Sequence, residues 1–120
     1  MKIMAESRNY QIVNSYETVY LKRKGTDQKI IIGDFYGDPE LAVISPDERY
    51  CVMAGAGIII YYLKKPFTQY RYNVQNSPQW KEWGREDAEN TIYVPNVSLL
   101  DDDRIEVETE EGEKVILNIY

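Results

Sequence analysis

The sequence contains no histidine, a single cysteine and no long hydrophobic run. Without histidine, the chain cannot form a Ser-His-Asp or Cys-His catalytic arrangement, a histidine-ligated zinc site or a histidine pH switch. One cysteine allows no internal disulfide, which is usual for a cytosolic chain. We therefore expect no cofactor, no metal and no enzymatic activity.

The longest mainly apolar stretch, residues 51–63, contains two glycines and stops before Lys64 and Lys65. It is shorter than the ~18 apolar residues that a membrane span needs. The first ten residues lack the apolar region of about seven residues or more that marks a secretory signal. These absences predict a cytoplasmic protein that does not associate with membranes.

Basic side chains are also scarce, because 14 Lys and Arg face 20 Asp and Glu, for a net charge of −6. The deficit is uneven: residues 82–113 hold twelve acids and two arginines, a local charge of −10, whereas the other residues carry twelve bases and eight acids. An acidic segment repels nucleic-acid phosphates and attracts basic proteins. The simpler interpretation is a solvated face without a partner.

Length and residue pattern predict a single all-β domain over residues 1–120. Hydrophobic residues make up 43% and charged residues 28%, as in globular domains. Polar and apolar residues alternate in 16–23 and in 105–119, and Ser45-Pro46-Asp47-Glu48 has the pattern of a type I turn. We expect about ten short strands in an antiparallel meander that forms a sandwich or a rolled sheet.

Residues 77–85 are the best candidate for the one short helix that we allow. Ser77 is a suitable N-cap and Pro78 suits the first helical position, although Gly84 interrupts the segment. If the segment is helical, the spacing of Trp80 and Trp83 places both rings on one side of a turn. An irregular loop is the alternative.

Residues 43–52 resemble the strand-turn-strand of a β-propeller blade. A chain of 120 residues supplies at most three blades of ~40 residues, below the usual number of about four. We do not expect a propeller, but a blade-like antiparallel meander remains open.

Other candidate sites have simple structural interpretations. The acids of residues 33–40 suggest a calcium loop but lack its register, and such Gly-Asp and Asp-Pro pairs are common in turns. Cys51 fits a small buried side chain better than a nucleophile. With twenty acids, a pair of carboxylates for glycoside hydrolysis is not excluded by counting.

Six tyrosines and tryptophans occur within residues 61–83. Such rings stack in cores, anchor protein interfaces or bind sugars and bases. We expect most of them in the core and one or two at an interface, and the acidic neighbourhood disfavours base stacking. The six residues are Tyr61, Tyr62, Tyr70, Tyr72, Trp80 and Trp83.

Three segments resemble small bacterial proteins among the immunity proteins of polymorphic toxin and contact-dependent inhibition systems. They are residues 30–39 (IIIGDFYGDP), 42–45 (AVIS) and 51–61 (CVMAGAGIIIY), within a similar region of about 29–72. The resemblance implies a non-catalytic protein that binds and blocks one toxin. An acidic surface is compatible with it, because many toxin nucleases expose a basic cleft.

We therefore expect an immunity-type inhibitor, monomeric or homodimeric, that covers a basic protein partner such as a toxin domain and does not bind nucleic acid. Two alternatives stay open: a scaffold protein that self-associates through a β edge, and a carboxylate-based hydrolase. If the chain is an immunity-type inhibitor, acidic residues steer its association with the partner, and one tryptophan anchors the complex. The expected binding residues are Asp101, Asp102, Asp103, Glu110, Glu111, Trp80 and Trp83.

Overall fold

The computed structural model describes residues 1–74, 76–87 and 89–120, which contain eleven strands and no helix. The all-β prediction is therefore confirmed. The strands are β1 (Lys2–Glu6), β2 (Tyr10–Ser15), β3 (Thr18–Arg23), β4 (Lys29–Asp34), β5 (Leu41–Ile44), β6 (Tyr50–Gly55), β7 (Gly57–Tyr62), β8 (Trp80–Trp83), β9 (Asn96–Leu99), β10 (Arg104–Glu108) and β11 (Lys114–Asn118).

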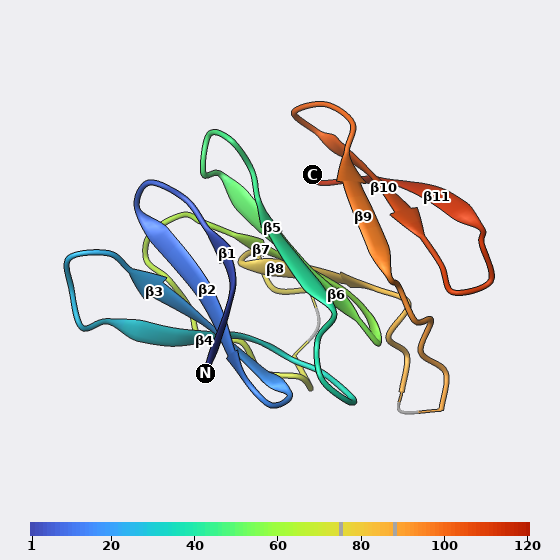
Figure 1. Cartoon of the computed structure of the whole chain (residues 1–120), viewed down its shortest axis with the longest axis horizontal. Helices are drawn as coiled ribbons and strands as arrows, with labels where there is room; N and C mark the ends of the chain where they lie inside the picture. Colours follow the sequence, from blue (N-terminus) through green and yellow to red (C-terminus); the bar gives the residue numbers. More distant parts are fainter. Residues whose placement is uncertain (75, 88) are drawn as a thin grey trace.

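The strands form three antiparallel sheets that follow one another along the chain and across the molecule (Figure 1). The first sheet contains β1–β4, the middle sheet β5–β8 and the third sheet β9–β11, each in sequence order. Every sheet is thus a meander, and its connections are short except for residues 63–79, which join β7 to β8. The radius of gyration is 13.2 Å, close to the ~13.6 Å expected for a compact chain of this length.

The middle sheet is buried on both faces, and its packing joins the two outer sheets. One face packs on the first sheet in a cluster that we call the first core, which includes Leu21, Met53 and Ile59. The other face packs on the third sheet in the second core, which includes Val52 and Ile60. Because side chains alternate along a strand, neighbouring residues of β6 and β7 enter different cores.

The strand-turn-strand over residues 43–52 forms as the blade-like pattern indicated, with β5 and β6 joined by a tight turn. The Glu48 amide donates to the Ser45 carbonyl over 2.9 Å, which closes the predicted turn. The Ser45 hydroxyl oxygen also accepts a hydrogen bond from the Arg49 amide over 2.9 Å.

The helix expected at residues 77–85 is wrong, because Trp80–Trp83 is strand β8 at the edge of the middle sheet. Trp80 pairs with Tyr61 and Trp83 with Ile58. In a strand, residues three apart point to opposite faces, so the rings are not on one side. Trp80 belongs to the first core and Trp83 packs against the second.

Candidate protein-interaction surface

Five connecting segments meet at one end of the three sheets, the lower end in Figure 1. Backbone hydrogen bonds join neighbouring segments: Phe35 N to Glu17 O (3.0 Å) within the first sheet, Val94 N to Gly55 O (2.8 Å) at the middle sheet and Glu110 N to Tyr93 O (3.0 Å) at the third sheet. We call this surface the acidic loop end. It comprises residues 16–17, 34–40, 55–57, 84–87 with 89–93, and 109–113.

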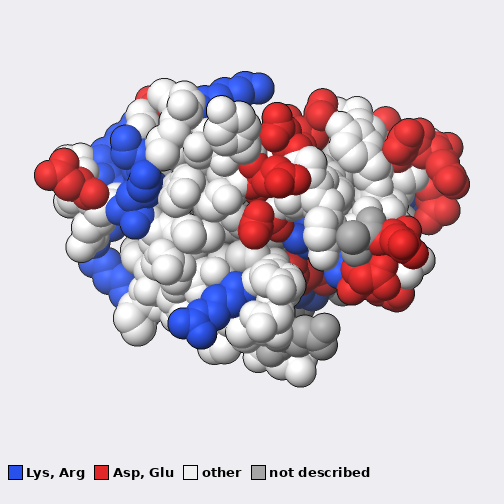
Figure 2. Space-filling model, turned by 90° about the horizontal axis from the view of Figure 1, so that it is seen from below, with Lys and Arg blue, Asp and Glu red and all other residues white. Residues whose placement is uncertain are grey.

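The acidic loop end collects carboxylates from distant parts of the chain, all on exposed residues. Figure 2 views this end directly and shows the acids spreading from the centre of the face across one side. Such a concentration creates a negative potential that raises the encounter rate with a basic partner. The ten acids are Glu17, Asp34, Asp38, Glu40, Glu86, Asp87, Glu89, Glu110, Glu111 and Glu113.

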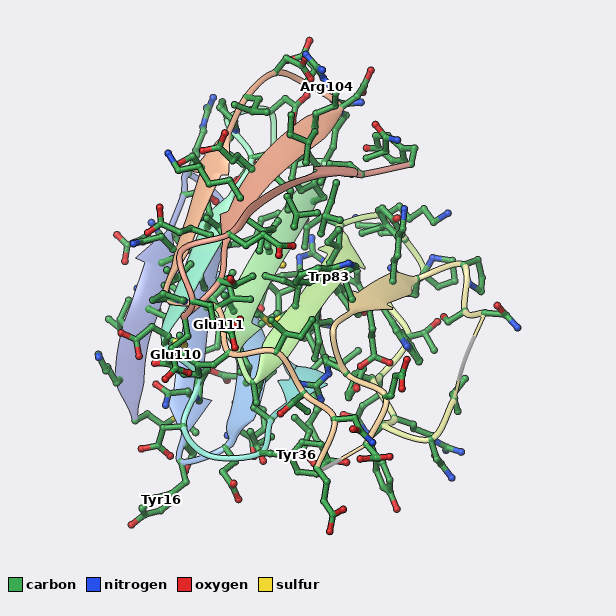
Figure 3. All side chains as sticks on the ribbon, turned by 90° about the vertical axis from the view of Figure 1, so that its right-hand side faces the viewer. Tyr16, Tyr36, Trp83, Arg104, Glu110 and Glu111 are labelled. Carbon is green, nitrogen blue, oxygen red and sulfur yellow. The ribbon has the colours of Figure 1, made fainter. Side chains whose placement is uncertain are left out.

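Exposed tyrosines accompany these acids. Tyr16 lies at the tip of the β2–β3 turn and is 82% exposed, and Tyr36 follows β4 and is 46% exposed. Figure 3 shows both at the end of the molecule opposite Arg104. Tyr93 is also exposed, and its hydroxyl donates to a Glu40 carboxylate oxygen. Tyrosines with few rotatable bonds are common anchors of protein interfaces.

Arg85 connects segments that underlie the acidic loop end. Its guanidinium donates to Glu82 Oε1 (2.9 Å), to the Ala56 carbonyl (2.6 Å) and to the Asp34 carbonyl (2.5 Å). It also lies 4.6 Å from the centre of the Phe35 ring. Because the side chain is only 5% exposed, we assign Arg85 a positioning role rather than contact with a partner.

A pocket of about 380 Å³ opens beside Arg85. Glu17 and Asp34 both line it, with Tyr36 and Tyr72 as aromatic walls. Partial burial of the Asp34 carboxyl raises its pKa, the negative charge of Glu17 raises it further, and the positive charge of Arg85 opposes the two in part. The pocket therefore holds two carboxyl groups that repel each other, and the positive charge of Arg85, which also lines it, offsets part of that repulsion.

The structure separates two groups of predicted binding residues. Asp101, Asp102 and Asp103 precede β10, whereas Glu110 and Glu111 follow it, so they lie at opposite ends of a strand about 17 Å long. Figure 3 shows this separation through Arg104 and the two glutamates. Only Glu110 and Glu111 belong to the acidic loop end.

The aspartate group is also partly neutralised. Arg104 forms an ion pair with Asp101 (2.7 Å), and Arg49 lies 3.9 Å from a carboxylate oxygen of Asp103. Within the described part of the chain, no ion pair involves Glu110 or Glu111. The glutamates therefore retain more of their charge for a partner than the aspartates do.

Neither tryptophan belongs to the acidic surface. Trp80 is 5% exposed, lies 5.1 Å from the Tyr70 ring and donates from Nε1 to the Val74 carbonyl over 3.3 Å. Trp83 is half-buried against the second core. Trp80 therefore serves the core, and only Trp83 keeps an accessible part.

Sequence reasoning missed the exposed tyrosines, although a signal was present. The alternation over 16–23 includes Tyr16 in a strand, whereas the structure puts Tyr16 in the turn before β3; Tyr36 stands next to Gly37 in a turn sequence. An aromatic residue at a turn tip has no sheet face on which to pack, so it is exposed unless another segment covers it.

The described residues contain no helix long and apolar enough to cross a membrane. Within the same part of the chain, no three His, Cys, Asp or Glu side chains are grouped as a metal site would require. The chain matches no known protein family, no curated protein and no solved structure.

Proposed function

We propose that this chain is a non-catalytic binding protein whose acidic loop end covers a basic surface of a partner protein. The observation that carries the proposal is the meeting of ten exposed carboxylates and three exposed tyrosines on one surface. Such a surface combines long-range attraction with rigid aromatic contacts. The resemblance to immunity proteins extends the proposal to inhibition of a bacterial toxin by occlusion of its basic cleft.

Binding would proceed in two steps under this proposal. The negative potential of the acidic loop end orients the partner during approach, which mainly raises the association rate. Tyr16 and Tyr36 then bury apolar area and exclude water, which mainly lowers the dissociation rate. A covered basic cleft no longer admits its substrate.

The test begins with capture of the partner from the native host by the immobilised chain, followed by purification of that partner. Association rates are then measured by stopped flow at low and at physiological salt. We expect Glu110→Lys with Glu111→Lys to slow association about tenfold at low salt and to flatten its salt dependence. Tyr16→Ala should instead raise the dissociation rate.

The matched control is Asp102→Lys with Asp103→Lys, which changes the charge equally at the opposite end of β10. We expect its association rate to remain within about twofold of the wild type. Equal slowing by both double variants would show that only net charge matters, and an unchanged rate in the glutamate variant would refute the proposed surface.

A second candidate function is carboxylate-based hydrolysis, and the pocket that Glu17 and Asp34 share is the observation that favours it. A carboxyl group with a raised pKa beside a second carboxylate is the arrangement that general acid catalysis uses. Under this alternative, Asp34→Asn abolishes turnover of a glycoside substrate. Under the binding proposal, neither the wild type nor the variant shows turnover.

A further inference from the structure

A groove of about 930 Å³ opens between the β3–β4 hairpin and the segment after β7. Its apolar floor continues the first core: Leu21 is part of that core, and Ile30 and Phe67 pack against it. The two sheets therefore leave an edge of their shared core open at this place. The lining consists of Leu21, Arg23, Gln28, Lys29, Ile30, Lys65, Pro66, Phe67 and Gln69.

The rim of the groove is positive although the chain as a whole is negative. Arg23, Lys29 and Lys65 line it, and no acidic residue does. None of the three takes part in an ion pair within residues 1–74, 76–87 and 89–120. The Lys29 ammonium lies 4.5 Å from the centre of the Tyr20 ring, a contact that leaves its charge unneutralised.

Amide groups complete the rim. Gln69 Oε1 accepts from the Ile31 amide over 3.4 Å, which leaves the Gln69 amino group as a donor. The Gln28 side chain has, among the described residues, only a long contact of 3.5 Å, from Arg23 to its Oε1. The groove thus offers cations and N–H donors around an apolar floor, a combination that recognises negatively charged oxygen atoms attached to an apolar body.

We propose that this groove binds a small organic anion: a carboxylate, sulfonate or phosphate ester that carries an aromatic or aliphatic body. Its volume is in the range of about 300–1,000 Å³ that small-molecule sites occupy. The apolar body lies on Leu21, Ile30 and Phe67, and the anionic group lies at the rim with Arg23 and Lys65. A nucleic acid is disfavoured, because a long phosphate chain needs a wider basic surface.

The groove is separate from the acidic loop end. Arg23 ends β3, whereas Thr18 begins that strand directly after Tyr16 and Glu17. The two sites therefore lie at opposite ends of the first sheet, and the ligand proposal does not depend on the proposed function.

The probe for the test is 8-anilinonaphthalene-1-sulfonate, a fluorescent aromatic anion, titrated into the folded full-length chain. We expect saturable binding at one site per chain, with shifts of the Leu21 and Ile30 methyl signals in NMR spectra. The uncharged analogue N-phenyl-1-naphthylamine should bind at least about tenfold more weakly, because it lacks the charge-assisted contacts. Equal affinities for the two probes would overturn the proposed anion recognition.

Three variants localise the charge effect. Arg23→Gln and Lys65→Gln should each weaken sulfonate binding about fivefold to tenfold. The matched control is Lys22→Gln, because Lys22 neighbours Arg23 on the opposite face of β3 and does not line the groove. Circular dichroism confirms that each variant is folded. Equal weakening by Lys22→Gln and Arg23→Gln, or no weakening by either groove variant, would overturn the proposal.

Occupation of the groove by a second copy of the chain is the competing outcome. In that case the sedimentation coefficient rises with protein concentration, and probe binding per chain falls as the chains associate. That pair of results would overturn the small-anion site, whereas concentration-independent sedimentation and probe binding support it.

Discussion

The side chain of Arg85 occupies the space where a side chain of Gly57 would lie. A Cβ atom built on Gly57 would be 2.0 Å from Arg85 Cγ, and the φ angle of Gly57 is +87°, which favours glycine. This absence of a side chain allows Arg85 to reach the Ala56 carbonyl and to brace the acidic loop end.

Gly57→Ala should therefore lower the free energy of unfolding by at least about 2 kcal/mol, because it combines backbone strain with displacement of Arg85. Urea unfolding monitored by circular dichroism measures the loss. The control is Gly25→Ala, which has a similar φ of +79° but no atom within 4 Å of the added Cβ. A loss no greater than that of the control would show that Arg85 moves away without cost.

The two tryptophans should respond differently to truncation. Trp80→Ala removes a ring buried in the first core and should cost about 3–5 kcal/mol of unfolding free energy. Trp83→Ala removes a half-buried ring and should cost roughly half as much, because the loss scales with the apolar area removed from water. Urea unfolding of the two variants tests this order, and a larger loss from Trp83→Ala would contradict it.

Glu48 should make stability depend on acid pH. Its carboxylate accepts from Asn9 N (2.9 Å), Asn9 Nδ2 (2.7 Å) and the Ser7 hydroxyl, so it joins turns of the first and middle sheets. The Ser7 hydrogen bond, followed by those from Asn9, lowers the Glu48 pKa below its ordinary value of 4.5. The stabilisation is therefore complete above that value and is lost as the pH falls through the lower pKa of the folded state.

Glu48→Gln should accordingly reduce the fall in unfolding free energy between neutral pH and about pH 3, measured by urea unfolding at each pH. The control is Glu111→Gln, because Glu111 is exposed and takes part in no ion pair within the described residues. Its pH dependence should run parallel to that of the wild type. A Glu48→Gln curve parallel to the wild type would refute the linkage.

Cys51 should resist thiol reagents while the chain is folded. The residue is fully buried in β6, and burial raises its thiol pKa to about 12. Both the low thiolate fraction and the lack of access slow the reaction. Labelling with 5,5′-dithiobis(2-nitrobenzoic acid) at pH 8 should be at least about 1,000-fold slower in buffer than in urea, because it requires opening of the middle sheet.

A variant that adds Ser98→Cys provides the positive control, since Ser98 is exposed on β9. Its added thiol should react in the folded state within the usual time for free cysteine. Rapid labelling of Cys51 itself in buffer would show that β6 opens easily, contrary to its position between two cores.

Part of this fold could be predicted from local patterns because one side of several strands faces water. Ile105 and Val107 alternate with Glu106 and Glu108, which identified the final hairpin. The strand β8 could not be recognised in this way, because its two tryptophans enter different cores. Coverage of a sheet on both faces depends on the tertiary structure. Two tryptophans three residues apart in such a strand then have the spacing that is typical of one side of a helix.

The candidate site could be predicted only in part for a related reason. Four acids of the acidic loop end lie in the region whose total charge is positive, so a count of charge along the sequence assigns them no binding role. They are Glu17, Asp34, Asp38 and Glu40. The up-and-down course of the strands brings them beside Glu110 and Glu111. The same course carries Asp101–Asp103 to the opposite end, which no linear count of charge reveals.

The double coverage of the middle sheet has a consequence for the newly made chain. Ile58 and Ile60 need the third sheet for cover, and that cover includes Ile119. Translation from Tyr62 to Ile119 takes about 3–11 s at the usual ~5–20 residues per second. During that interval one face of β6 and β7 is exposed to other chains, so aggregation on the ribosome competes with completion of the fold. Slower translation of residues 84–119 should therefore lower the yield of native protein.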